Sequence, residues 1–308
     1  MIQMPVYNPG RLIEAIRTDH VHGADWLSNA AISVIATASL KEPAETVDEL
    51  HEKLWGYAIE LAGSRPSMAP LVNKLGVLFS RLDGIDDIRD YRARATEFSG
   101  LVVDESTQAK KRMIEHLKTV VDDVETVFTY SNSDTVKQAI RELGVRKIIV
   151  TESRPLNEGV ALAEEFASEG IDVLLGVDAS IHMYMNAADV VLVGADSVQH
   201  DGGVINKVGT RMLAHAAKVN KVPFYVLCDT MKFNVLNYLG QPIELEEKAP
   251  KEVAEPRENL RVRNIYFEVT PPELITAVIT EEGAMEPLDI RRKMEELRKM
   301  VEPLLNPN

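Results

Sequence analysis

Residues 189–229 read DVVLVGADSVQHDGGVINKVGTRMLAHAAKVNKVPFYVLCD, and this stretch decides the fold class. Two short apolar runs, 190–193 and 224–227, flank a segment over 206–220 in which apolar residues recur at helical spacing. The helix is expected to begin at Asn206–Lys207. Short buried strands that alternate with helices of about ten to fifteen residues are typical of βαβ units in a parallel sheet. The stretch therefore predicts an α/β protein.

The same alternation runs through the chain from about residue 124 onward. Further strand-like runs, each followed by a helical segment, lie at 125–131, 146–153 and 171–177. Before residue 124 the apolar spacing is helical, over 24–40, 46–63 and 69–82 and in a long charged stretch over 85–121. We therefore predict a helical domain over 1–123 and a Rossmann-like domain over 124–308. The second domain should hold a doubly wound, mostly parallel sheet, an exposed polar excursion over 244–264 and a C-terminal helix.

Composition limits the function classes. The 308 residues carry a formal net charge of −14 and no basic stripe, which argues against direct binding of nucleic acid. The single cysteine, Cys228, excludes an intrachain disulfide and a cysteine-cluster metal site. No apolar run approaches the length of a membrane helix, and the first residues lack the pattern of an export signal. We expect a cytoplasmic protein with no membrane contact.

Polar clusters follow the predicted strands at the points where they end. They lie at 129–135, 151–155, 176–180, 194–207 and 228–233. Open parallel sheets bind ligands beyond the carboxyl ends of their strands, so these clusters predict one site. Gly202 and Gly203 would let a backbone approach a ligand, while free helix amides near Asn206, with Lys207 and Arg154, favour phosphate. The ligand is predicted to be a small phosphorylated molecule.

Other ligand classes have little support in the sequence. The glycine loop matches neither the GxxxxGK[ST] pattern of a phosphate-binding loop nor the GxGxxG pattern of a dinucleotide site. The seven histidines show no repeated metal-ligand spacing. We therefore expect no nucleotide cofactor and no metal.

The site residues also have structural interpretations when taken singly. Gly202–Gly203 is more typical of a turn, Lys207 of a solvated lysine and Arg154 of an ion-pair partner. Asp196 could cap its loop, and Cys228 is more typical of a small buried apolar residue than of a nucleophile. Their convergence at one edge of the sheet favours a binding site.

Four motifs carry a family resemblance. They are SRPSMAPL (64–71), TESRPLNEG (151–159), GADSVQHDGGVINKVGT (194–210) and FEVTPPELITAVITEEG (267–283). Together they resemble the family of the alpha, beta and delta subunits of translation initiation factor 2B. That family includes the aldose-1-phosphate ketose-isomerases acting on methylthioribose 1-phosphate and ribose 1,5-bisphosphate. HGADWL (22–27) with RPSMAPL is most similar to the archaeal initiation-factor-2B-like members. The resemblance implies a ligand cleft between the two domains, and homodimers or hexamers built from dimers.

The resemblance also implies roles for individual residues. The catalytic aspartate of the isomerases falls on Asp196, and their catalytic cysteine falls on Ser131. An unactivated serine hydroxyl does not give up a proton near neutrality as a thiol can. His22–Gly23 replaces the Arg-Gly pair typical of the isomerases, which weakens one phosphate contact. The other implied phosphate-binding residues are Arg65, Arg154, Asn206, Lys207 and Lys232.

Two interpretations stay open, so enzyme activity is left undecided. We favour a protein that binds a sugar phosphate or a nucleoside monophosphate in a regulatory role linked to translation initiation, with the GTP-binding initiation factor 2 as candidate partner. The alternative is an isomerase of phosphorylated ribose, similar to ribose-1,5-bisphosphate isomerase, which uses Asp196 and replaces the thiol by Ser131, a bound water or a nearby group.

Overall fold

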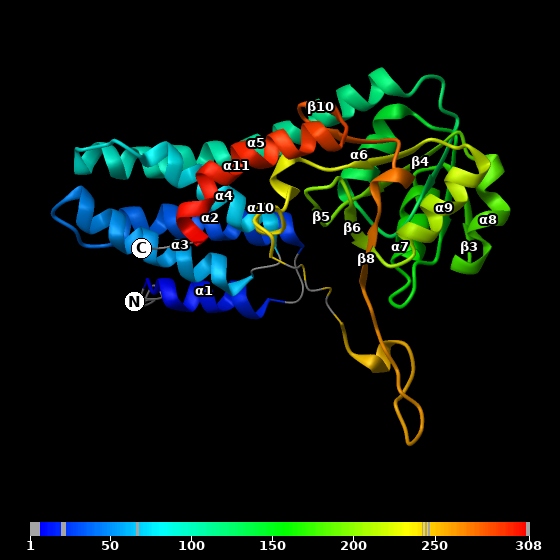
Figure 1. Ribbon diagram of the computed structural model, residues 1–308, viewed down its shortest axis with the longest axis horizontal. Helices are drawn as coiled ribbons and strands as arrows, with labels where there is room; N and C mark the ends of the chain where they lie inside the picture. The colour runs from blue at the N-terminus through cyan, green and yellow to red at the C-terminus, as the bar shows by residue number, and fades with distance from the viewer. Residues whose placement is uncertain are drawn as a thin grey trace. The chain divides into compact units, whose positions relative to one another are not determined.

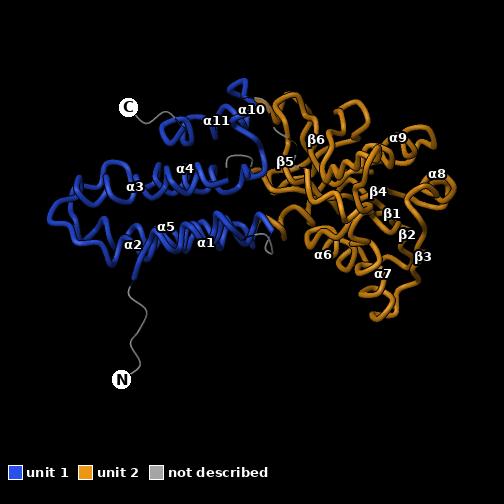
Figure 2. Tube along the Cα trace, turned by 90° about the horizontal axis from the view of Figure 1, so that it is seen from below, with its two compact units in different colours: residues 1–108, 231–241, 292–308 blue, residues 109–230, 242–291 orange. Residues whose placement is uncertain are grey.

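The computed structural model describes residues 7–19, 23–65, 68–241, 243, 245 and 247–305. Over this part of the chain, two compact units are distinguished (Figure 2). Unit 1 combines residues 1–108, 231–241 and 292–308, and unit 2 combines residues 109–230 and 242–291. Each unit is therefore assembled from segments that are distant in the sequence.

Unit 1 is helical, as the apolar spacing predicts. Its helices are α1 (Pro9–Thr18), α2 (Ala24–Lys41), α3 (Val47–Ser64), α4 (Ala69–Leu82), most of α5 (Ile88–Val120), the short α10 (Val235–Tyr238) and most of α11 (Pro287–Leu305). Thr46 begins α3 as its N-cap, because its side chain accepts a hydrogen bond from the backbone N–H of Glu49 at 3.2 Å. The three helices expected over 24–82 are confirmed.

Helix α4 is the centre of unit 1, and nearly all of its residues are buried. Gly76 packs against α11, where a Cβ atom would lie 2.8 Å from the Met300 carbonyl oxygen. The Asn73 side chain donates hydrogen bonds to the carbonyl oxygens of Met231 at 2.7 Å and Phe233 at 2.8 Å. The core of this unit thus uses residues from all three of its segments.

Unit 2 is built on a mostly parallel sheet. In the described residues this sheet has seven strands in the order β10-β9-β7-β4-β1-β2-β3, and β10 pairs antiparallel with β9. The strands are β1 (Thr126–Thr129), β2 (Lys147–Thr151), β3 (Asp172–Gly176), β4 (Val190–Gly194), β7 (Phe224–Leu227), β9 (Ala277–Thr280) and β10 (Gly283–Met285). Figure 1 shows the strands and the connecting helices of this unit. The predicted α/β fold class is confirmed.

Helices connect the parallel strands of unit 2. They are α6 (Asp134–Leu143), α7 (Glu158–Ser168), the short α8 (Ile181–Tyr184) and α9 (Thr210–Asn220). One buried cluster joins α6, α7 and the end of α5 to the sheet, with Phe166 of α7 and Ile148 of β2 both fully buried. Burial of these apolar side chains is the main favourable term for folding of this layer.

The predicted helix start at Asn206–Lys207 is wrong. These residues end a strand, β6 (Val204–Lys207), which pairs antiparallel with β5 (Ser197–Val198) and with β8 (Phe267–Thr270). Gly202 has φ 90°, and the Gly203 carbonyl accepts a hydrogen bond from the Gln199 backbone, so the glycines form the turn between β5 and β6. The structural interpretation of Gly202–Gly203 as a turn is therefore confirmed.

The polar excursion predicted over 244–264 extends from unit 2. Most side chains over 250–263 are exposed, as expected, and isolated bridges join Glu247 to Ile265 and Arg257 to Leu260. Among the helices of the described ranges, none has both the length and the apolar character required to cross a bilayer.

Candidate functional site

The candidate site lies at the carboxyl ends of the parallel strands in unit 2. Ser131 follows β1, Arg154 follows β2 and Asp196 follows β4. Since β1 pairs with both β2 and β4 in parallel, these three residues leave adjacent strands at the same edge of the sheet. Asn206 and Lys207 belong to the same unit, on β6. Unit 2 therefore holds five of the predicted site residues.

Ser131, Glu158 and Lys207 form a connected polar cluster, which we call the 131–158–207 cluster. The Ser131 hydroxyl donates a hydrogen bond to Glu158 Oε2 at 2.7 Å, and the Lys207 ammonium donates one to Glu158 Oε1 at 3.0 Å. Lys207 is only 4% exposed, and its Nζ lies 4.0 Å from the centre of the Tyr266 ring. Lys207 is therefore a buried ion-pair partner and not a solvated lysine.

Glu158 was missed by the sequence analysis. It stands beside Gly159 in the quoted motif TESRPLNEG, but three residues beyond the polar cluster assigned to the end of its strand. As the first residue of α7, it begins a helix whose next residue packs directly on the end of β2. A carboxylate inside the same motif as Arg154, a predicted phosphate-binding residue, is the signal that could have found it.

The backbone beside Ser131 is held by a second set of hydrogen bonds. Ser131 has φ 64°, in the left-handed region, and its backbone N–H donates to Ser153 Oγ at 2.9 Å. The backbone N–H groups of Ser153 and Arg154 both donate to the Asp178 carboxylate, at 2.9 and 2.8 Å. Burial, and then the charge of Asp178, raise the pKa of the Tyr130 hydroxyl well above its usual range. These contacts fix the loops that carry Ser131 and Arg154.

Two backbone amides at the start of α9 are already hydrogen-bonded to a carboxylate. The Glu268 carboxylate accepts hydrogen bonds from the backbone N–H groups of Gly209 at 2.6 Å and Arg211 at 3.0 Å. The Asn206 side chain donates to Thr210 Oγ1 at 3.2 Å, and that hydroxyl donates to the Lys207 carbonyl oxygen. The Glu268 carboxylate therefore occupies two of the donors to which an anion would bind at this helix start, and anion binding there stays a prediction. Direct phosphate binding by Asn206 stays a prediction.

Asp196 lies between β4 and β5 and is exposed to solvent. Its backbone N–H donates to the Ile205 carbonyl oxygen at 2.9 Å, which ties the loop to β6. Cys228, at the end of β7, is only 1% exposed, as expected for a small buried apolar residue. Asp196 thus presents a carboxylate at this edge of the sheet, while the thiol is withdrawn from it.

The remaining predicted contacts belong to unit 1 or lie outside the described residues. Gly23 is the N-cap of α2, and Lys232 lies half-buried in a short turn of helix over 230–232. The Arg65 guanidinium donates to the carbonyl oxygens of Ile16, at 3.2 and 3.3 Å, and Asp19. His22 lies outside the described residues. Phosphate binding by these residues stays a prediction.

Glu281 follows β9 and is half-buried beside Thr230. The Thr230 hydroxyl donates to Glu281 Oε1 at 2.6 Å, but burial raises the pKa of Glu281, and the nearby Asp229 carboxylate raises it further. A raised pKa in the folded state means that this group stabilises the fold fully below its unfolded pKa of about 4.3. That contribution is lost as pH rises through the higher pKa of the folded state.

Replacement of Glu281 by glutamine is therefore expected to change the free energy of unfolding, relative to the wild type, more favourably as pH rises. Relative to Glu281→Gln, the wild type should lose free energy of unfolding as pH rises above about 4, because only the wild type must ionise a half-buried carboxyl. Urea unfolding at a series of pH values measures this difference. Glu282→Gln, at the exposed neighbouring position, is the control and should show a much smaller trend. A stability difference for Glu281→Gln that does not change with pH would contradict the prediction.

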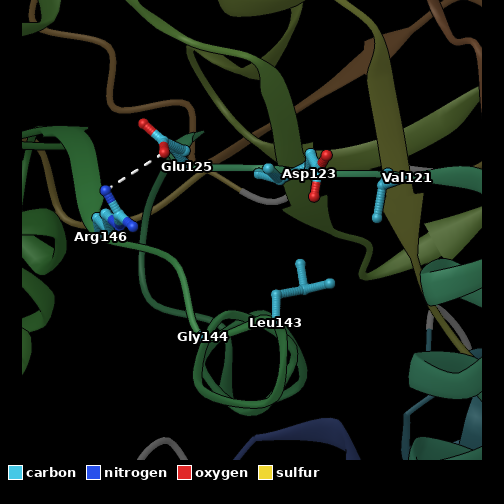
Figure 3. Close-up of a pocket in the computed structure, with 7 residues that line it drawn as sticks. Val121, Asp123, Glu125, Leu143, Gly144 and Arg146 are labelled. Carbon is cyan, nitrogen blue, oxygen red and sulfur yellow. Dashed lines mark ion pairs between the residues drawn. The ribbon is translucent and has the colours of Figure 1, made fainter.

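A cavity of about 540 Å³ lies elsewhere in unit 2 (Figure 3). Its lining includes Glu125 and Arg146, an ion pair with a 3.4 Å separation, and these residues precede β1 and β2. The cavity is therefore at the amino ends of the strands, opposite to Ser131. Within the described ranges, no group of three or more His, Cys, Asp or Glu side chains is placed to hold a metal ion.

Known proteins resemble the chain over nearly its whole length. A model of the initiation factor 2 subunit family matches residues 20–287. A ribose 1,5-bisphosphate isomerase of Archaeoglobus fulgidus is 36% identical over 89% of this chain and 88% of its own length. A protein of Pyrococcus horikoshii described as translation initiation factor eIF-2B subunit 2-like is 32% identical over 91% of this chain and 98% of its own length. The crystal structure of translation initiation factor eIF-2B from Pyrococcus horikoshii OT3 matches with a TM-score of 0.72 and 30% identity, over 92% and 98% of the two chains.

Proposed function

Because the chain belongs to the initiation factor 2 subunit family, we propose that it is a sugar-phosphate isomerase that converts a phosphorylated ribose from the aldose 1-phosphate to the ketose. The observation that carries this proposal is the 2.7 Å hydrogen bond between Ser131 and Glu158, which pairs the serine at the thiol position with a carboxylate. Relatives named ribose 1,5-bisphosphate isomerase support the same assignment. The proposal replaces the regulatory role favoured by sequence alone.

The chemistry needs one proton donor and one proton acceptor. The bond between C1 and the ring oxygen breaks, and the ring oxygen takes a proton. A hydrogen moves with its electron pair from C2 to C1, and the hydroxyl on C2 loses its proton as the ketone forms. Asp196 and Ser131 follow neighbouring parallel strands, β4 and β1, and we assign the two proton transfers to them.

Phosphate recognition is assigned to the cations near the same edge. The Arg154 guanidinium has a planar fork that suits phosphate, and its backbone is fixed by the Asp178 carboxylate. Lys207 forms an ion pair with Glu158, so we assign it two roles. It balances the charge of Glu158 within the site, and it contacts the ligand. Gly23, His22, Arg65, Asn206 and Lys232 are proposed contacts on the basis of the family motifs.

Ligand binding without turnover is the second candidate function. It is favoured by a specific observation, the serine hydroxyl in place of a thiol at residue 131. The relative described as eIF-2B subunit 2-like supports it too. In this case the ligand would be a sugar phosphate or a nucleoside monophosphate. The GTP-binding initiation factor 2 would be the candidate protein partner.

A paired assay on the purified chain tests the proposal. We expect ribose 1,5-bisphosphate to raise the unfolding temperature and to be converted to the ketose, which NMR of the carbon skeleton detects. A ligand at 100 times its Kd adds about 2.7 kcal/mol to the free energy of unfolding. The same assay with methylthioribose 1-phosphate and with nucleoside monophosphates measures ligand specificity. Inorganic phosphate is the control for binding of the anion alone. Stabilisation without conversion of any of these ligands would sink the isomerase proposal and favour the second candidate.

A further inference from the structure

We infer that Glu158 is a positioning residue that accepts the proton of Ser131, so that a serine can transfer protons where a thiol would otherwise be needed. This inference rests on the proposed isomerase function for its role in turnover. Its structural basis is the 131–158–207 cluster, which can be tested with no substrate present.

The backbone of Glu158 is fixed by its neighbours on both sides. Asn157 has φ 58° and precedes the helix, and the Gly159 backbone N–H donates to the Glu152 carbonyl oxygen at 3.1 Å. Gly159 packs so closely on the end of β2 that a Cβ atom would lie 1.8 Å from the Thr151 carbonyl oxygen. The first residue of α7 therefore has little freedom to move away from Ser131.

The charges around Glu158 favour a hydrogen bond in which the Ser131 hydroxyl is the donor and Glu158 is the acceptor. Lys207 is almost fully buried, and its hydrogen bond to Glu158 Oε1 forms an ion pair that leaves Oε2 for Ser131. A serine hydroxyl has one proton to donate and two lone pairs. Because that proton points to Glu158, Ser131 can only accept from a ligand. The cluster thus makes Ser131 an acceptor for a ligand hydroxyl.

Proton transfer through this cluster removes the proton of the C2 hydroxyl, and Asp196 supplies the proton that the ring oxygen takes. The O–H bond of the ligand C2 hydroxyl breaks, and its proton passes to Ser131 Oγ. The hydroxyl proton of Ser131 passes at the same time to Glu158 Oε2, giving a neutral carboxylic acid beside Lys207. The electron pair left on the ligand oxygen forms the ketone as hydrogen moves from C2 to C1. After the ketose leaves, Glu158 passes its proton back to Ser131 Oγ as that hydroxyl gives a proton to water, and Asp196 regains from water the proton that it gave to the ring oxygen, so the starting state is restored.

A thiol at residue 131 reports the charge of Glu158 directly. In Ser131→Cys, the rate of alkylation by iodoacetamide as a function of pH gives the pKa of the new thiol, and the wild type measures the background from the buried Cys228. We expect Glu158→Gln, added to Ser131→Cys, to lower that pKa by about one unit or more. A like charge this close disfavours the thiolate, and nearby charges shift a pKa by about 1–3 units, so a substitution that removes the negative neighbour but keeps Lys207 lowers the thiol pKa.

Matched variants separate this effect from a general change in charge. Glu164→Gln makes the same substitution at an exposed position on α7 and should leave the thiol pKa unchanged. Lys207→Met should raise the thiol pKa, in the opposite direction to Glu158→Gln. If Glu158→Gln shifts the thiol no more than Glu164→Gln does, the inference is overturned.

Turnover provides the second readout and distinguishes two kinds of failure. In the chain with Ser131 intact, Glu158→Gln should lower kcat with little change in KM, and Glu158→Asp should restore part of the rate. Equal kcat for Glu158→Gln and wild type would overturn the role in proton transfer. If the wild type itself converts no ligand, the proposed function fails, while the thiol measurement still decides whether Glu158 governs residue 131.

Discussion

Asp196→Asn is expected to lower kcat for the aldose-to-ketose conversion by about 10²–10⁴-fold, the range typical for loss of a general acid or base. Asparagine keeps the size and the hydrogen-bonding capacity of aspartate, but it cannot give or take a proton in this reaction. The backbone hydrogen bond from Asp196 to Ile205 does not involve the side chain, and the residue is exposed, so the fold should be retained. Initial rates followed by NMR, with KM determined separately, measure the effect.

Asp172→Asn is the matched control for that experiment. Asp172 begins β3, at the amino end of its strand, and its side chain is 72% exposed. The same chemical change there should leave kcat within about twofold, since the residue is at the edge of the sheet opposite to Ser131. A conversion rate for Asp196→Asn close to that of Asp172→Asn would remove Asp196 from the proposed chemistry.

Gly159→Ala is expected to destabilise the fold by about 3 kcal/mol or more, at the upper end of the range for overpacking a closely packed site. The added methyl group would lie 1.8 Å from the Thr151 carbonyl oxygen and 3.0 Å from Ser153 Oγ. The closer of these atoms is backbone, so α7 and the end of β2 must separate to relieve the clash. The midpoint of urea unfolding measures the loss, and the same separation should move Glu158 away from Ser131.

Gly100→Ala is the control for the helix propensity of alanine. Gly100 lies in α5, where a Cβ atom would meet nothing within 4 Å. Alanine there should be neutral or stabilising by about 0.5–1 kcal/mol, because glycine loses more backbone entropy on folding. A stability for Gly159→Ala equal to that of Gly100→Ala would show that the contact with Thr151 does not constrain the helix.

The alternation of strands and helices was predictable because the spacing of apolar residues within short stretches of sequence indicates it. Apolar runs such as 190–193 and 224–227 are buried on both faces of a parallel sheet, so they stand out without knowledge of their partners. The carboxyl-end rule then placed Ser131, Arg154 and Asp196 at one edge of that sheet. These features depend on short-range sequence and on the general geometry of parallel sheets.

The errors came from partners that are distant in the sequence. Val204–Lys207 forms a strand because β8, about sixty residues later, pairs with it, and the periodicity before α9 does not reveal that partner. Glu268, also on β8, accepts hydrogen bonds from two backbone N–H groups at the start of α9, which the sequence does not reveal. Glu158 meets Ser131 across 27 residues and Lys207 across 49. Long-range pairing of this kind is decided by tertiary packing, which one sequence does not display.

The assembly of unit 1 from three segments sets the order in which a ribosome can complete the two units. Domains generally fold during synthesis as their residues emerge. The hydrogen bonds of α4 to Met231 and Phe233 cannot form until those residues have been synthesised. In the same way, Gly76 cannot pack on Met300 and Val301 until the end of the chain has been synthesised. Residues 109–291, which contain all of unit 2, emerge before those last partners. The helices translated first are therefore the last to be fully packed, and the nascent chain exposes apolar surface on α4 for most of its synthesis.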